Sequence, residues 1–263
     1  MKIFGLRPFA VQPFVILIAC GLGLGMTSFA QKAKPPAPRS KPPDYKSMSL
    51  TPLKTLAENG DAQAQNELGM AYASGKKGTK QPDLKEAFKW VRMAAESGLD
   101  RAQYHLGGFY FYGSGVPKDY QEAMKWYRKS ADQGFTQAQY FLGWLHSTGI
   151  GSDEKFKDFK ESVLWFKKAA DQGDPEAQLS LGLMYLRGED LNPDYVEAYK
   201  WINLSAAHGN TNAIRHRVKL SVSMTSDQIA EGQRRAVQFS EKPPGTAGAT
   251  NKPAAPPPRP VGK

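Results

Sequence analysis

Four tryptophans recur at nearly constant spacing, and this repetition limits the possible folds more than any other feature of the 263-residue sequence. Successive tryptophans are 36, 39 and 36 residues apart, and each is followed eight residues later by a glycine. A unit of this length cannot bury its own apolar faces, so repeated units must stack on one another. The tryptophans are Trp90, Trp126, Trp165 and Trp201.

Each unit is predicted to form two helices. In the second unit, Ala102, Leu106 and Tyr110 lie at positions i, i+4 and i+8, which is one stripe of a helix. A like stripe surrounds Trp126 in the second half of the unit, and Gly107 gives room for this second helix to approach closely. The pattern predicts an all-α fold, a right-handed α-α superhelical solenoid of stacked helix hairpins.

The positions that keep this spacing are expected to form the core of the repeat. Each unit supplies a leucine-glycine pair, a tyrosine four residues after the leucine, and the tryptophan. In the third unit His146 replaces the tyrosine. The structural positions are Leu68, Gly69, Tyr72, Trp90, Leu106, Gly107, Tyr110, Trp126, Leu142, Gly143, Trp165, Leu181, Gly182, Tyr185 and Trp201.

The glycine-rich segment Gly113-Ser114-Gly115 is predicted to be a turn. A phosphate-binding loop follows a strand and precedes a helix, and it needs a lysine and a hydroxyl or a later acidic residue at set positions. Here a predicted helix comes first, and the counterpart segments of the third and fourth units carry acidic residues. We therefore expect this segment to join the two helices of one unit.

The four units share one consensus, alanine-x3-leucine-glycine-x2-tyrosine-x2-glycine followed by glutamate-alanine-x2-tryptophan-x3-small-alanine-x2-glycine. It resembles the Sel1-like repeat family, whose members are relatives of tetratricopeptide repeats. Full repeats fall at about 62–98, 100–134, 136–173 and 175–209, and flanking half-repeats extend the solenoid over 49–221. The resemblance implies a capping helix at 222–241, with Thr225 and Gln228 forming a capping box.

The resemblance implies a non-enzymatic adaptor that binds a protein or peptide partner on the concave face of the solenoid. Proteins of this family bind other proteins, often in bacterial envelope regulation, secretion or surface assembly. Two alternatives stay open: a cell-wall-associated enzyme or ligand binder, as in β-lactam-interacting relatives, and a passive structural spacer. Those relatives carry a cysteine pair in each repeat, whereas Cys20 is the only cysteine here.

Charge is unevenly distributed along the chain. The formal net charge is +10, but residues 47–241 hold 24 basic and 24 acidic residues. The excess therefore lies at the ends, and we expect no nucleic-acid partner. A Pro/Lys-rich linker at 31–48 and a Pro/Ala-rich tail at 242–263 are predicted to be disordered, and their basic residues would allow weak contact with an anionic membrane or cell wall.

The first 30 residues have the pattern of a signal peptide. Lys2 and Arg7 precede an apolar stretch, and Ala30 is a small residue suited to cleavage. We expect an exported, periplasmic protein cleaved after Ala30. Two alternatives are a lipoprotein at Cys20, because the preceding residues resemble a lipobox, and an uncleaved anchor over Phe9–Ala30, which is long enough to span a bilayer.

Aromatic residues that the repeat does not require gather in the first helices of the second and third units. In related solenoids these helices line the concave face, and aromatic side chains on rigid helices make strong interface contacts. His105 and His146 lie in the same two helices, where they could face one groove. The candidate partner-binding residues are Tyr104, His105, Phe109, Tyr112, Tyr140, Phe141 and Trp144.

The sequence shows no pattern that predicts catalysis or metal binding. None of the four histidines has a metal-ligand spacing such as HExxH. Serine-x-x-lysine occurs at Ser74 and Ser152, but in predicted turns and without the partner motifs of penicillin-recognising enzymes. We expect no catalytic, cofactor-binding or metal-binding residue and no enzymatic activity.

Overall fold

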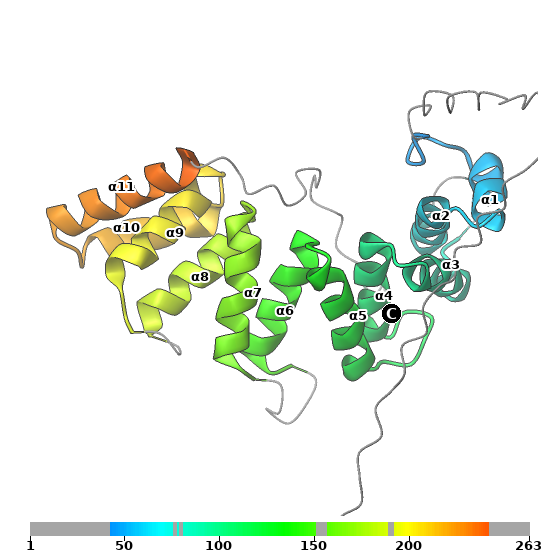
Figure 1. Ribbon diagram of the computed structural model, residues 1–263, viewed down its shortest axis with the longest axis horizontal. Coiled ribbons are helices and arrows are strands. Elements are labelled where there is room, and N and C mark those ends of the chain that lie inside the picture. The colour runs from blue at the N-terminus through cyan, green and yellow to red at the C-terminus, as the bar shows by residue number, and fades with distance from the viewer. Residues whose placement is uncertain (1–42, 76–77, 79–80, 151–156, 189–191, 242–263) are drawn as a thin grey trace, which may run out of the picture. The chain divides into compact units, whose positions relative to one another are not determined.

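The computed structural model describes residues 43–75, 78, 81–150, 157–188 and 192–241 (Figure 1). Within these residues the chain forms eleven α-helices and no strand. From α1 to α10 each helix packs against the next along the chain, and α11 packs back on α9. The predicted all-α solenoid of stacked helix hairpins is confirmed.

Four hairpins form the repeats, each with a first and a second helix of equal length. The first helices are α2 (Ala62–Ser74), α4 (Asp100–Tyr112), α6 (Thr136–Thr148) and α8 (Pro175–Arg187). The second helices are α3 (Leu84–Glu96), α5 (Tyr120–Asp132), α7 (Phe159–Asp171) and α9 (Tyr195–Ala207). The half-repeats are α1 (Leu50–Glu58) and α10 (Thr211–Ser221), and α11 (Ser226–Glu241) follows.

The second helices begin in the same way in every repeat. An aspartate at the N-cap accepts hydrogen bonds from backbone N–H groups of the first turn, which would otherwise have no partner. In α5, for example, Asp119 Oδ1 accepts from the N–H of Glu122 at 3.0 Å. The backbone N–H of Asp119 also donates to the carbonyl of Tyr110 at 3.0 Å, which closes the turn between the two helices. The segment Gly113-Ser114-Gly115 is thus a turn, as its sequence predicts.

Glycine ends both helices of each hairpin. First helices stop at a C-cap glycine in the left-handed region, such as Gly113 with φ 71°. Second helices stop two residues before a glycine of positive φ, such as Gly134 with φ 90°. Positive φ strains residues with a Cβ, so glycine sets these boundaries.

The glycine of each leucine-glycine pair sits where the two helices of a hairpin meet. A Cβ added to Gly107 would lie 2.8 Å from the ring of Tyr127, and one added to Gly143 would lie 2.6 Å from the ring of Phe166. The facing side chain is the residue directly after the repeat tryptophan, a position that the sequence analysis did not single out. In the outer repeats this position is filled by Val91 against Gly69 and by Ile202 against Gly182.

The repeat tryptophans differ in burial, which corrects the expectation that all four belong to the core. Trp165 and Trp201 are buried, as is Trp90. Trp126 is only half-buried, although it packs against the core cluster that contains Leu106. The Nζ of Lys129 lies 3.9 Å from the centre of the Trp126 ring and covers part of its face. Tyr72, Tyr110 and Tyr185 are likewise half-buried.

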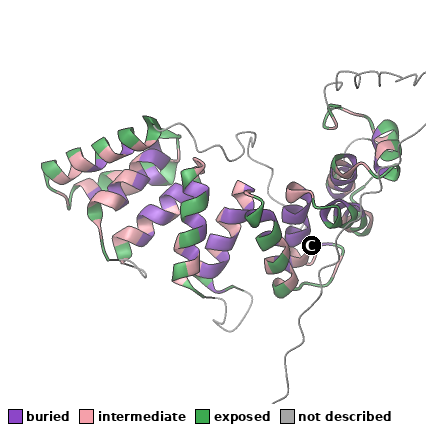
Figure 2. Ribbon diagram, in the orientation of Figure 1, coloured by how far each residue is buried: buried purple, intermediate pink, exposed green. Residues whose placement is uncertain are grey.

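First and second helices differ in how much they bury. Nearly all residues of the first helices α4 and α6 are buried or half-buried (Figure 2). The second helices α5 and α7 each keep an exposed face.

Buried glutamines connect neighbouring repeats. One follows the recurrent alanine of every first helix, and its Nε2 donates to a carbonyl of the preceding helix, as Gln139 does to Ala131 at 3.1 Å. In the inner repeats a second glutamine completes the link: Gln172 Nε2 donates to Gln139 Oε1 at 2.7 Å and to the Gly134 carbonyl at 3.1 Å. We call this pair of glutamines the glutamine clamp; Gln133 and Gln103 form the other.

Side-chain hydrogen bonds are also present at both ends of the described solenoid. The Thr225 backbone N–H donates to Gln228 Oε1, and the Gln228 N–H donates to Thr225 Oγ1, so the predicted capping box is present before α11. At the other end, Tyr45 donates from its hydroxyl to Asp61 at 2.7 Å. Tyr45 is thus packed, although it lies inside the segment assigned to the 31–48 linker.

Several expectations fall on the ends of the chain, beyond the described residues. The signal peptide with its alternatives, residues 31–42 of the linker and the 242–263 tail all lie there. Among the described residues, none of the helices combines the length and apolar character needed to cross a bilayer.

Candidate functional site

An aromatic pocket of about 450 Å³ opens between the first helices of the two inner repeats. Two of its residues come from the last turn of α4 and three from α6. Aromatic side chains at an accessible pocket are typical of binding sites, since they offer large contact areas at low entropic cost. The pocket is lined by Phe111, Tyr112, Tyr140, Phe141 and Trp144.

Edge-to-face contacts fix the rings of this pocket. Phe111 lies 5.0 Å from Tyr112 and 6.0 Å from Trp144, measured between ring centres. Phe141 lies 6.0 Å from Trp144 and stacks on Tyr127 of α5 at 5.3 Å. Because the rings brace one another and a buried neighbour, the pocket is pre-formed, and little side-chain freedom is lost when a ligand enters.

Acidic groups lie on the α8 side of the pocket. Burial raises the pKa of Tyr140 to about 12, and the nearby charges of Glu176 and Asp174 act in the same direction. Asp174 is the N-cap of α8, where its carboxylate accepts from the Ala177 N–H at 2.8 Å. Burial raises the pKa of the Asp174 carboxyl above its usual value. At neutral pH the Tyr140 hydroxyl is protonated and available as a donor.

The seven candidate partner-binding residues separate into two groups. Tyr112, Tyr140, Phe141 and Trp144 are half-buried and line the aromatic pocket. Tyr104, His105 and Phe109 are buried, so their side chains belong to the core and do not form an accessible surface. Each is covered by a different neighbour: Tyr104 packs against Tyr127 and Phe141, His105 contacts Asn66 of α2, and Phe109 packs against Phe88 of α3.

The two histidines considered together have different neighbours and form no common groove. His105 Nδ1 lies 2.7 Å from Asn66 Oδ1 of α2, and burial, with the charge of Arg101 adding to it, lowers the pKa of His105 to about 3. His146 is also buried, and its Nε2 lies 3.5 Å from the guanidinium of Arg128 on α5. Both therefore act in packing between helices.

Phe111 is the one pocket residue that the sequence analysis missed. It is buried and contributes the inner wall, between Tyr120 at 5.2 Å and Trp144 at 6.0 Å. Its position between two tyrosines in the run Phe109–Tyr112 was the available signal. Helical periodicity alone did not tell which members of that run face outward.

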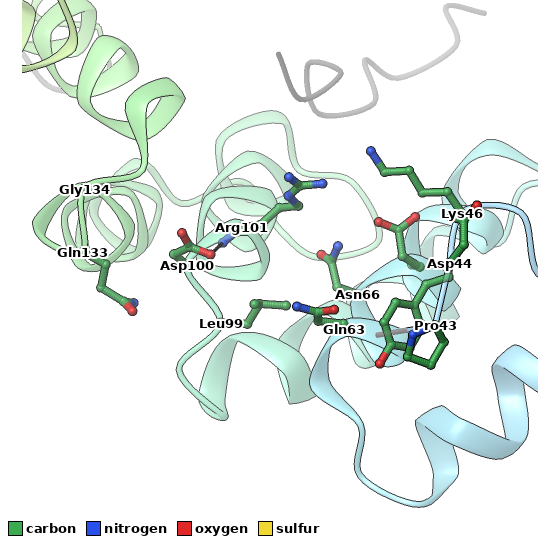
Figure 3. Close-up of a pocket in the computed structure, with 12 residues that line it drawn as sticks. Pro43, Asp44, Lys46, Gln63, Asn66, Leu99, Asp100, Arg101, Gln133 and Gly134 are labelled. Atoms are coloured by element: carbon green, nitrogen blue, oxygen red, sulfur yellow. Dashed lines mark hydrogen bonds between the residues drawn. The ribbon is translucent and has the colours of Figure 1, made fainter. Parts of the chain in front are cut away.

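A second pocket of about 460 Å³ lies beside the first turns of α2 and α4 (Figure 3). The start of α4 supplies Asp100 and Arg101, α2 supplies Gln63 and Asn66, and residues 43–46 before α1 form the facing wall. Its ionisable side chains have both signs, with Asp44, Glu67 and Asp100 beside Lys46 and Arg101. This mixture favours no particular charged ligand.

The described residues contain no group of three or more histidine, cysteine, aspartate or glutamate side chains that could hold a metal ion. Ser74, from the serine-x-x-lysine match at the end of α2, donates its hydroxyl to the Met70 carbonyl at 2.9 Å. That hydroxyl is thus engaged with its own helix. The second match, at Ser152, lies outside the described residues.

Comparison with known proteins matches the chain to the family model described as Sel1 repeat. Four successive copies match, at residues 62–99, 100–135, 136–174 and 175–210, and together they cover more than half of the chain. These boundaries agree within one residue with the repeats predicted from the sequence. A comparison with curated proteins gives no match.

Solved structures with a similar fold include the following two. One is a protective antigen present in uropathogenic Escherichia coli strains and displaying an SLR fold, with 37% identity and a TM-score of 0.64. That match covers 73% of this chain but only 41% of the antigen, so the chain spans about two fifths of its length. The other is a Sel1 repeat protein from Oxalobacter formigenes, with 29% identity, a TM-score of 0.58, and coverage of 68% of this chain and 71% of that one.

Proposed function

This chain belongs to the Sel1 repeat family, and we propose that it is a non-enzymatic adaptor that binds a protein or peptide through the aromatic pocket. Repeats of this family generally mediate contacts between proteins. The pocket is the single observation that carries the proposal, because the repeat does not require its accessible rings. A peptide of two to four residues fits a volume of this size, so recognition of a short exposed segment of the partner suffices.

The rings favour an apolar or aromatic anchor from the partner. Trp144 and Tyr112 present large faces to the pocket, and Tyr140 adds a hydroxyl that can donate to a peptide carbonyl. Aromatic anchors in pockets of this kind carry much of the binding energy of protein interfaces. The bracing of the rings supports the proposal further, because a pre-formed pocket lowers the entropic cost of binding.

Peptide selection on the full-length protein tests this function. Peptides recovered from a random library are expected to bind at least tenfold more weakly to Trp144→Ala and to Tyr112→Ala than to the wild type. Tyr195→Ala on α9 and Leu164→Ala on α7 are matched controls, since both side chains are exposed on second helices. Affinities are measured by fluorescence anisotropy, with thermal melting to show that each variant is folded. Equal affinity of pocket and control variants would exclude the pocket as the binding site.

We place this function in the bacterial cell envelope. The proposal is supported by the signal-like pattern of residues 1–30, with its three possible outcomes of cleavage after Ala30, lipidation at Cys20 or an uncleaved anchor. The basic ends would add weak contacts with anionic membrane or cell wall. Mass spectrometry of the mature N-terminus from fractionated cells distinguishes the three outcomes, and an intact Met1 in the cytosolic fraction would contradict all of them.

A further inference from the structure

The sequence after α11 has a composition that matches the chemistry of the aromatic pocket. Residues 242–263 hold seven prolines and four basic residues, with no acidic residue. We infer that the segment 253–260 of this tail, Pro-Ala-Ala-Pro-Pro-Pro-Arg-Pro, occupies the aromatic pocket of its own chain. The inference rests on the proposed function, since it names the segment that fills the pocket until a partner displaces it.

Proline-rich segments and aromatic pockets fit one another for physical reasons. Consecutive prolines favour the polyproline II helix, which has no internal hydrogen bonds and leaves its carbonyls free. Such a helix is already ordered before it binds, and aromatic-lined grooves hold it by packing rings against the prolines. Here Trp144 and Tyr112 supply the faces, and the hydroxyls of Tyr112 and Tyr140 can donate to the free carbonyls.

The charges near the pocket complement those of the tail. Asp174 and Glu176 lie close enough to Tyr140 to affect its hydroxyl. Arg259 is set among the prolines of the segment, and Lys252 and Lys263 flank it. A basic side chain next to a docked proline helix would thus meet carboxylates at the start of α8, which favours the tail over an acidic peptide.

The tail begins close enough to reach the pocket. Phe239, in the last turn of α11, packs against Trp201 with 5.1 Å between ring centres. Tyr140 and Trp144 pack against the same hydrophobic cluster. The residues from 242 to 252 would span up to about 34 Å in a polyproline II conformation. Packed helices are about 8–10 Å apart, so this length covers three to four neighbouring helices.

The other proline-rich segment, residues 35–43, is the less suitable occupant. It enters the described structure at Pro43, and residues 43–46 line the polar pocket beside α2 and the start of α4 (Figure 3). Pro43 therefore lines a different pocket, one with few aromatic rings and mixed charge. This difference makes the N-terminal prolines a matched control.

Site-specific photo-cross-linking of the full-length protein tests where the tail lies. A photoreactive phenylalanine derivative in place of Ala255 is expected to cross-link within one chain to peptides containing Tyr112 or Trp144. Products are separated by size and identified by mass spectrometry. Cross-links to the same peptides in a product of twice the mass would place the tail in a second copy and overturn the same-chain assignment. Cross-links elsewhere, or none, would overturn docking in the pocket.

Competition with a synthetic peptide of residues 250–263 measures occupancy. A tethered tail has a local concentration of about 1 mM, so against a Kd of ~0.1 mM it would weaken binding of the free peptide on the order of tenfold. The full-length variant P256A/P257A/P258A should therefore bind the peptide about tenfold more tightly than wild type. The control P35A/P36A/P38A should match wild type, and adding Tyr112→Ala to the tail variant should abolish the gain.

Equal peptide affinity in the wild type and the tail variant would overturn self-occupancy. A gain in the N-terminal control instead would assign the pocket to the other proline segment and also overturn the inference. Failure of this inference can be distinguished from failure of the proposed function. If peptides selected from the library still need Tyr112 while the tail variant changes nothing, the pocket keeps its function and only its occupant is wrong.

Discussion

The two inner repeats, 100–135 and 136–174, share their hairpin framework with the outer repeats, 62–99 and 175–210, but differ in the side chains around it. The pocket residue Tyr112 corresponds to Ser74 in the first repeat and to Arg187 in the fourth. Tyr140 corresponds to Asn66 and Leu179. The inner repeats thus carry the candidate binding site on positions that the fold leaves free to vary.

The inner repeats also have the stronger links to their neighbours. Both glutamine clamps use a glutamine that follows an inner second helix, Gln133 or Gln172. The outer counterparts are Ser97 and His208, and the Oε1 atoms of Gln65 and Gln178 that would face them are buried without a partner. A pre-formed pocket needs a rigid frame, and the clamps are found on the repeats that carry it.

The largest expected loss of stability comes from a substitution at Gly143, where α6 closely approaches α7. In Gly143→Ala the new Cβ would lie 2.6 Å from Phe166, so the helices must separate, and we expect a loss of about 3 kcal/mol in the free energy of unfolding. Urea denaturation measures the loss. Phe166→Ala removes the clashing ring, so the double variant should cost less than the sum of the single changes. Additive losses would show that the ring does not set the helix spacing.

The next largest loss of stability is expected from a substitution in the glutamine clamp. Gln172→Ala removes both donated hydrogen bonds and leaves the Gln139 amide oxygen buried without a partner. The expected loss is about 2 kcal/mol, because an unpaired buried polar atom costs more than one hydrogen bond contributes. Thermal melting compares this variant with Ser97→Ala at the corresponding outer position, where no clamp exists. Equal losses of stability at the two positions would show that the clamp does not stabilise the fold.

The framework could be predicted from the sequence because it repeats. Four copies of one spacing identify the hairpins, the helix-ending glycines and the close approach at Gly107, since each copy confirms the others. The pocket could be predicted only in part. Tyr104 and Phe109 were as aromatic as Tyr112, and only the packing of the neighbouring helices α3, α5 and α6 against α4 decides which rings are covered. The alanine-glutamine pairs recur in the sequence, but the sequence does not show their partners, Gln133 and Gln172, which follow the second helix of the same repeat.

A buried histidine makes the contact between the first two repeats sensitive to pH. Burial lowers the pKa of His105 to about 3, whereas an unfolded histidine titrates near 6.5. The unfolded chain therefore takes up this proton first as the pH falls, and the contribution of His105 to stability is lost below pH 6.5. From pH 7 to pH 5 this loss is about 2 kcal/mol. His105→Gln, measured by urea denaturation at both pH values, should remove it; an unchanged pH dependence would show that other groups cause it.

The smallest expected effect converts an outer repeat to the inner arrangement. In Ser97→Gln the new amide should donate to the buried Gln65 oxygen, as Gln133 does to Gln103 at 2.8 Å. We expect a gain of about 1 kcal/mol, reduced by the lost bond from the Ser97 hydroxyl to the Met93 carbonyl. The double variant S97Q/Q65A provides the control, since it removes the intended acceptor. A gain that persists in the double variant would mean that the new glutamine acts on its own helix end, and the difference between inner and outer repeats would then not depend on the clamp.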